Sequence, residues 1–110
     1  MIRAANDVRL RFGDESLTEI RRAARWYDRQ RRGLGDEFLE ALHARLSQLL
    51  ASRGLASRVA HAPPDVRVRR VLLRRFPYAV VFLETDEEIR VIAVMHGKRK
   101  PGYWLGRLTK

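Results

Sequence analysis

Two stretches of the chain repeat apolar residues every three or four positions, which is typical of amphipathic helices. The apolar positions of the first stretch, residues 16–33, are Leu17, Ile20, Ala24 and Tyr27. Ser16 and Glu19 have the spacing of a capping box, which predicts the start of this helix. Gly33 after two arginines predicts its end. The second stretch, residues 36–54, has Phe38, Leu39, Leu42, Leu46, Leu49 and Leu50 on one side. A three-residue link between the stretches predicts an antiparallel helical hairpin.

Segments rich in β-branched residues surround the hairpin. Residues 66–75, 78–84 and 89–96 are predicted strands, separated by breaks short enough for antiparallel hairpins. Alternation of Val8, Leu10 and Phe12 with arginines predicts one more strand before the helices. Residues 55–65 lack periodicity and contain two prolines, so we expect a connecting loop there. The predicted fold is α+β, a single domain over residues 1–110 with the order β-α-α-β-β-β and the hairpin on one face of an antiparallel sheet.

The last two predicted strands are apolar on both faces, because Val80 and Phe82 alternate with Val81 and Leu83. A sheet with two apolar faces needs a cover on each of them. We expect residues 97–110, which contain Tyr103 and Trp104, to fold back over the second face. The alternative is a partner protein that binds an exposed apolar patch.

Charge and cysteine content narrow the function classes. The net charge is +10, and residues 67–110 hold 11 Lys and Arg against 4 Asp and Glu. Such a field favours an anionic partner such as nucleic acid, a ribosome or an acidic protein, although solvated charges that keep a small protein soluble would give the same composition. The absence of cysteine excludes disulfides and thiolate metal sites. No apolar run approaches the length of a membrane span, so we expect a cytoplasmic protein with no metal, no cofactor and no membrane association.

The C-terminal segment holds the strongest candidates for chemistry. His96 ends the last strand and begins a run of basic and aromatic residues, namely Lys98, Arg99, Lys100, Tyr103 and Trp104. This mixture suits phosphates and stacked bases. His96, Arg99 and Tyr103 could also cleave RNA by acid–base catalysis. The alternatives are a His96 bonded to backbone, a solvated basic turn, and a Trp104 that anchors the tail.

Other candidates are weaker. Alternation along residues 66–75 would send Arg70 and Arg74 to one face, and Arg67, Arg69 and Arg75 to the other. His43 is expected on the surface of the second helix, and His61 lies in the proline-containing loop without a partner at metal-ligand spacing.

The chain resembles the RelE/ParE superfamily of bacterial toxins from type II toxin–antitoxin systems, and within it the ParE-like, plasmid-stabilisation branch. The resemblance spans roughly residues 9–107. Its most specific motifs are the pair Trp26-Tyr27, the link Gly33-Leu34-Gly35 with Phe38, the turn Arg75-Phe76-Pro77-Tyr78, and the segment from His96 to Trp104. The order of elements expected above matches the fold of that superfamily.

The resemblance implies two different activities. RelE-like members are ribosome-dependent mRNA endonucleases, whereas ParE-like members poison DNA gyrase without a known hydrolytic centre. At the position of a catalytic arginine of the nucleases this chain has Ala79, and one of two nuclease lysines maps near Leu72, the other near Arg70. Arg99 does match a nuclease arginine, and Tyr103 lies near, but not in register with, a nuclease tyrosine. These departures favour the gyrase poison over the nuclease.

For a gyrase poison, we expect target contacts from Arg70, Arg74, Lys98, Arg99, Lys100, Tyr103 and Trp104. Deletion of residues 97–110 is then expected to abolish toxicity and preserve the fold. The family also implies a neutralising antitoxin, ParD-like or similar, for which Trp26, Tyr27 and the arginines of the first helix are candidate contacts; Trp26 could instead pack between the hairpin and the sheet. A third hypothesis is an inactive toxin retained as a binding module, which lack of growth inhibition would reveal.

Overall fold

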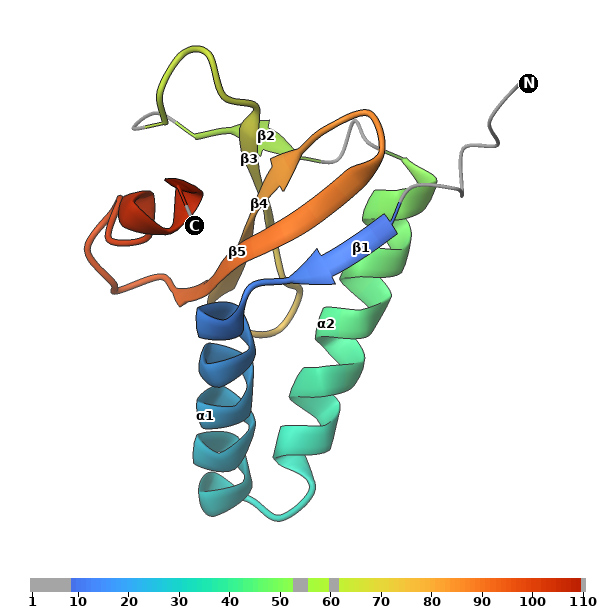
Figure 1. The fold of residues 1–110 in the computed structure, drawn as a ribbon. Coiled ribbons are helices and arrows are strands. Elements are labelled where there is room, and N and C mark those ends of the chain that lie inside the picture. The colour runs from blue at the N-terminus through green and yellow to red at the C-terminus, as the bar shows by residue number, and fades with distance from the viewer. Residues whose placement is uncertain (1–8, 53–55, 60–61, 110) are drawn as a thin grey trace.

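The computed structural model describes residues 9–52, 56–59 and 62–109. A five-stranded sheet in the order β1-β5-β4-β3-β2 lies against the two long helices, which run side by side as a hairpin (Figure 1). The elements are β1 (Arg9–Phe12), α1 (Asp14–Gln30), α2 (Leu34–Ala51), β2 (Ser57–Arg58), β3 (Val68–Leu72), β4 (Tyr78–Glu84), β5 (Glu88–His96) and the 3₁₀ helix η3 (Leu105–Thr109). The predicted α+β fold is confirmed.

The sheet is mixed rather than purely antiparallel. The pairs β2–β3, β3–β4 and β4–β5 are antiparallel, as predicted, but β1 lies parallel to β5 with Phe12 opposite Val91. The reason is the connection, since the hairpin and three strands intervene between β1 and β5 and no tight turn sets their relative direction. The expected loop before β3 also contains the two-residue strand β2.

Helix α1 begins earlier than the capping box predicted. Its N-cap is Gly13, whose amide continues the strand pairing by donating to the carbonyl oxygen of Val91 at 2.9 Å. Ser16 lies inside the helix, where its hydroxyl donates to the Gly13 carbonyl oxygen at 2.7 Å. Glu19 points to the sheet and does not cap the helix. The capping-box prediction is therefore wrong, because the strand fixes the helix start and leaves both side chains one turn too late.

The two helices approach closely at the start of α2. A Cβ atom on Gly35 would lie 2.4 Å from the carbonyl oxygen of Ala24, so only glycine fits there without a shift. The Gly35 amide also donates to Asp28 Oδ1 at 2.8 Å. Gly33, with φ of 90°, makes the left-handed turn that precedes it. The link predicted from its glycines thus sets the tight crossing of the hairpin.

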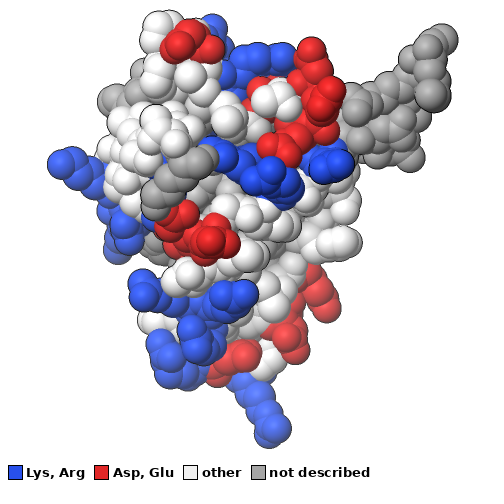
Figure 2. All heavy atoms as spheres, viewed as in Figure 1, with Lys and Arg blue, Asp and Glu red and all other residues white. Residues whose placement is uncertain are grey.

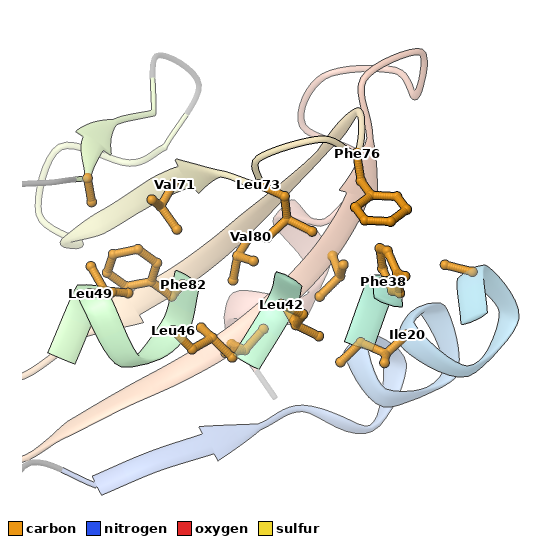
Figure 3. Close-up of a cluster of buried hydrophobic side chains, with 14 of the residues drawn as sticks. Ile20, Phe38, Leu42, Leu46, Leu49, Val71, Leu73, Phe76, Val80 and Phe82 are labelled. Atoms are coloured by element: carbon orange, nitrogen blue, oxygen red, sulfur yellow. The ribbon is translucent and has the colours of Figure 1, made fainter. Parts of the chain in front are cut away.

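The face of the sheet toward the helices carries the helix-side core, in which side chains of α2 and of β3 and β4 point toward one another (Figure 3). An aromatic group closes one end of this core: Tyr27 stacks on Phe38 with ring centroids 5.4 Å apart and meets Phe76 edge-on at 4.9 Å. The buried members of the helix-side core are Ile20, Ala23, Tyr27, Phe38, Leu42, Leu46, Leu49, Ala56, Val71, Leu73, Phe76, Val80, Phe82, Ile89, Val91 and Val94.

The opposite face carries a second, smaller cluster, the tail-side core. Its buried members are Val68, Ala79, Val81, Ile92, Ala93, Met95 and Trp104. Residues after β5 turn back across the sheet on the side away from the helices and end in η3 (Figure 1). Trp104 is only 1% exposed, so the prediction that the tail covers the second face is confirmed.

Candidate functional site

The basic loop, residues 97–102, leaves β5 in a defined geometry. The Lys98 amide donates to His96 Nδ1, and the Arg99 amide donates to the His96 carbonyl oxygen, both at 3.0 Å. The Gly97 amide donates to the carbonyl oxygen of Pro77 at 2.8 Å, which ties the loop to the turn before β4. His96 is thus bonded to backbone at a strand end, as one of the sequence alternatives held. The side chains of Lys98, Arg99 and Lys100 are exposed.

Beyond the basic loop, the carboxylate of Glu19 fixes the tail to α1 and β5. It accepts hydrogen bonds from the Tyr103 hydroxyl, from both terminal nitrogens of Arg107 at 3.0 and 3.2 Å, and from the Val94 amide at 3.0 Å. Arg107 also donates to the carbonyl oxygen of Ile92 at 3.0 Å. We call Glu19, Tyr103 and Arg107 the tail anchor. It joins a helix, the sheet and the tail in one polar cluster.

Ionisation of Tyr103 is strongly disfavoured by this arrangement. Burial raises the pKa of Tyr103 well above its usual range, and the hydrogen bond to the negative Glu19 raises it further. The guanidinium of Arg99 lies 4.0 Å from the centre of the same ring, where a cation is attracted by the ring face. Tyr103 is therefore a neutral donor held in place, and a poor proton acceptor near neutral pH.

A groove of about 600 Å³ lies between α1, the ends of β4 and β5, and the basic loop. We call it the α1 groove. His96, Arg99 and Tyr103, the three residues proposed for a nuclease, all line it, so the structure does bring them together. Its complete lining is Glu19, Arg22, Ala23, Arg25, Trp26, Tyr27, Arg29, Tyr78, Val94, His96, Arg99 and Tyr103.

Ala79, which replaces a nuclease arginine in the resemblance, does not line the α1 groove. It lies in the tail-side core and lines a second groove of about 590 Å³, the β3 groove, together with Arg70, Leu72 and Arg99. The two grooves lie on opposite faces of the sheet and share Tyr78 and Arg99 among their linings. A side chain at position 79 would thus point to the opposite face of the sheet from His96, which pairs with Tyr78.

The arginines around β3 do not form one basic surface. Arg67 and Arg69 donate to the buried carboxylate of Glu84, at 3.4 and 3.2 Å. Arg75, in a left-handed conformation with φ of 72°, donates to Glu37 at 2.8 Å. Arg70 and Arg74 were predicted to share a face but are separated, because β3 ends at Leu72. Arg70 lines the β3 groove, whereas Arg74 lies beside α2.

The predicted contact residues differ in accessibility. The Trp26 side chain is 50% exposed on α1, so the alternative that it packs between hairpin and sheet is wrong. Tyr27, by contrast, is 9% exposed within the helix-side core and offers a partner little surface. Trp104 is buried as the cover of the tail-side core, so in this conformation it cannot touch a target. His43 is exposed on α2, as expected, and His61 lies outside the described residues.

Sequence reasoning missed the tail anchor and the α1 groove. Glu19 was interpreted as a local cap, although its partners lie 75 to 88 positions away in the chain. Arg22, Arg25 and Arg29 were expected, with the other arginines of the first helix, to contact the antitoxin, but not to line a groove. The usable signal for the groove was their spacing with Trp26, which places all four side chains on one face of α1.

Among residues 9–52, 56–59 and 62–109, no three His, Asp or Glu side chains lie together as metal ligands. Neither helix in the described ranges is long and apolar enough to cross a membrane.

Comparisons with known proteins identify the family. A search of curated proteins gives no match. Among solved structures, the chain is similar to one from Pseudomonas aeruginosa described as "Chromosomal ParDE TA system from P. aeruginosa", with a TM-score of 0.65 and 13% identity over 83% of this chain and 97% of the other. That likeness shows a shared fold. The family described as "ParE toxin of type II toxin-antitoxin system, parDE" matches residues 10–101, and the chain therefore belongs to the ParE toxin family.

Proposed function

We propose that this protein poisons DNA gyrase and so inhibits growth until a cognate antitoxin neutralises it. The observation that carries the proposal is the state of the three candidate nuclease residues. The Tyr103 hydroxyl is engaged by Glu19, and His96 accepts a backbone amide through Nδ1, while the basic loop beside them is exposed. This arrangement supports binding by the loop better than cleavage in the groove.

The proposed target surface is the basic loop together with neighbouring Arg70. Lys98, Arg99 and Lys100 project from one short loop whose two ends are fixed, at Pro77 and at the tail anchor. Such a loop loses little conformational entropy on binding, because its backbone is already ordered. Arg70 lies in the β3 groove with Arg99 and extends the positive surface from the loop onto the sheet.

The proposed partner is an acidic or amphipathic antitoxin of the ParD type. The P. aeruginosa structure carries the name of a two-component ParDE system, and the +10 charge of this chain favours an acidic partner. The half-exposed Trp26 remains a candidate contact for the antitoxin. Tyr27 would act by supporting the Trp26 ring, which it meets edge-on at 5.1 Å.

The test is a gyrase supercoiling assay with purified protein, run beside primer extension on mRNA from translating ribosomes. We expect supercoiling to be inhibited or cleaved DNA to be trapped, with intact mRNA. Codon-phased mRNA cuts with unaffected gyrase would overturn the proposal and favour a nuclease built on His96 and Arg99. An effect in neither assay, with no growth inhibition, would favour an inactive binding module.

Variants of the basic loop locate the activity without removing the tail. Deleting residues 97–110 would remove Trp104 together with Tyr103 and Arg107 of the tail anchor, and would uncover the tail-side core, so we expect it to impair folding. The triple variant Lys98→Gln, Arg99→Gln and Lys100→Gln keeps those groups and is expected to lose most gyrase inhibition. A matched control, Arg9→Gln, Arg21→Gln and Arg32→Gln, removes the same charge at exposed positions outside both grooves and should stay active.

The nuclease is kept as a second candidate because His96 and Arg99 line the same groove. If it operates, His96→Ala should abolish mRNA cleavage and leave any effect on gyrase unchanged. If the gyrase proposal is correct, the same variant should retain inhibition.

A further inference from the structure

Three arginines on the exposed face of α1 have no ionic partner among the described residues. Arg22, Arg25 and Arg29 line the α1 groove, yet within the described ranges none of them makes an ion pair or a side-chain hydrogen bond. Basic side chains gather over α1 in the space-filling view (Figure 2). Three adjacent positive charges on one helix repel one another, and a bound anion would relieve that repulsion.

Trp26 stands among these arginines and supplies a flat surface. Its indole is 50% exposed, which is unusual for so large an apolar group, and its edge-on contact with Tyr27 holds the ring in place. A planar ring that stacks on Trp26 would remove this apolar surface from water. Base–aromatic stacking of this kind is a common means of binding nucleotides.

The opposite wall of the groove adds another cation and more ring surface. Arg99 lies over Tyr103, and His96 meets Tyr78 edge-on at 5.2 Å. The carboxylate that lines the groove, that of Glu19, is already engaged by the other two members of the tail anchor. Its charge is therefore offset by Arg107, and the net charge offered to a ligand is positive.

We propose that the α1 groove is a binding site for a nucleoside phosphate, with the phosphate held by Arg22, Arg25 and Arg29 and the base stacked on Trp26. The volume of about 600 Å³ lies within the usual range for small-ligand sites. A simple anion would pair with the arginines but leave the aromatic rings exposed to water, whereas an uncharged ring would leave the arginines without a counter-charge. A nucleoside phosphate has both an anionic group for the arginines and a planar base for Trp26. Its source is either a free nucleotide or the end of a single strand, and the site does not depend on gyrase being the target.

The test is a titration of the purified full-length chain followed by tryptophan fluorescence and by calorimetry. Since Trp104 is buried, quenching by a stacked base reports on Trp26. The probes are adenosine 5′-monophosphate, adenosine, inorganic phosphate, and a six-nucleotide single strand with a 5′-phosphate. We expect saturable quenching by the monophosphate. Adenosine and inorganic phosphate should each bind with an affinity at least about tenfold lower in the calorimeter. If the single strand binds more tightly than the monophosphate, the ligand is a strand end. If the monophosphate binds more tightly, the ligand is the free nucleotide.

Three variants and one matched control separate a built site from general charge attraction. Arg22→Gln and Arg25→Gln should each lower the affinity for the monophosphate by about fivefold or more. Trp26→Leu should abolish the quenching and weaken binding in the calorimeter. Arg21→Gln is the matched control, because it removes one charge from the adjacent position of the same helix outside the groove and should leave affinity within about twofold.

Three results would overturn the proposal. Equal binding of monophosphate and inorganic phosphate, or equal weakening by Arg21→Gln and Arg22→Gln, would mean that only the general positive field attracts anions. Tight binding of an acidic peptide such as hexaglutamate, with no binding of the monophosphate, would assign the groove to a protein segment. None of these results bears on the gyrase assay, so the two proposals fail separately.

Discussion

The two faces of the sheet are covered by different means. On the helix side, the α1–α2 hairpin packs apolar and aromatic side chains continuously against β3, β4 and β5. On the tail side, one short segment supplies one large buried ring, Trp104, and is fixed by the polar tail anchor. The first cover depends mainly on apolar burial, which is non-directional, and the second also on hydrogen bonds with defined geometry. We therefore expect the helix side to determine whether the chain folds, and the tail side to determine the shape of the basic loop.

The largest expected effect is on the helix side. Phe38→Ala would leave a cavity within the aromatic group formed with Tyr27 and Phe76, and should lower the free energy of unfolding by about 3–5 kcal/mol. Because this core joins both helices to the sheet, loss of stability should be global. Chemical denaturation followed by circular dichroism measures it. A change below about 1 kcal/mol would contradict the view of this face as the main stabilising core.

Trp104→Ala should act more locally. The ring is buried against Val81, Met95 and neighbouring residues of the tail-side core, so its loss should cost about 2–4 kcal/mol if the tail stays docked. The tail can limit that cost by detaching. We expect amide hydrogen exchange to accelerate selectively in residues 103–109 and at Val94, with the helices still protected. Uniform acceleration throughout the chain would show instead that both faces open together.

Glu19→Gln tests the polar part of the tail cover. The amide keeps the shape of the side chain but loses the charge that holds Arg107, and we expect a loss of roughly 1–3 kcal/mol. Both side chains are less than one-fifth exposed, so this ion pair should contribute more to stability than a pair on the surface. Denaturation gives the free energy, and exchange at the Val94 amide reports the local opening. Unchanged exchange there would mean that Glu19 is not what fixes the tail.

The raised pKa of Tyr103 makes the free energy of unfolding depend on pH through the tail side. Burial and the bond to Glu19 raise this pKa in the folded state, so above the ordinary tyrosine value of about 10 the unfolded chain releases a proton that the folded chain keeps. The contribution to stability is complete below that pH and is lost as pH rises further. Tyr27 and Tyr78 act in the same direction through burial. Denaturation between about pH 9 and 11.5 should show a shallower decline in Tyr103→Phe than in the parent chain; identical slopes would exclude Tyr103 as a contributor.

Sequence reasoning predicted the elements that rest on local patterns and missed what rests on distant contacts. The bounds of β4 were predicted residue for residue, and α2 within two or three residues, because alternation and helical spacing are properties of neighbouring positions. The direction of β1 and the true partners of Glu19 depend on residues far along the chain. No local pattern encodes them.

The candidate site was predicted in part for the same reason. The cluster from His96 to Trp104 was recognised because its members are adjacent in sequence, whereas the α1 groove joins them to Trp26 and three arginines of a distant helix. The burial of Trp104 was anticipated by the two apolar faces of β4 and β5. The separation of Arg70 from Arg74 was not, because alternation was extended past Leu72, where the strand ends.

The spacing of the tail contacts has a consequence for how such a protein can diversify. Trp104 and Arg107 lie three residues apart and dock as one unit, with the Arg107 amide donating to the Trp104 carbonyl oxygen at 2.9 Å. Upstream, Gly97 is tied to Pro77, and Gly102, with φ of 81°, makes the turn that leads into the docked unit. Between these fixed points positions 98–100 are exposed and contribute to neither core, although Arg99 also lies over the Tyr103 ring. Mutations there can therefore accumulate without loss of the scaffold, and one fold can acquire new specificities by exchanging three residues.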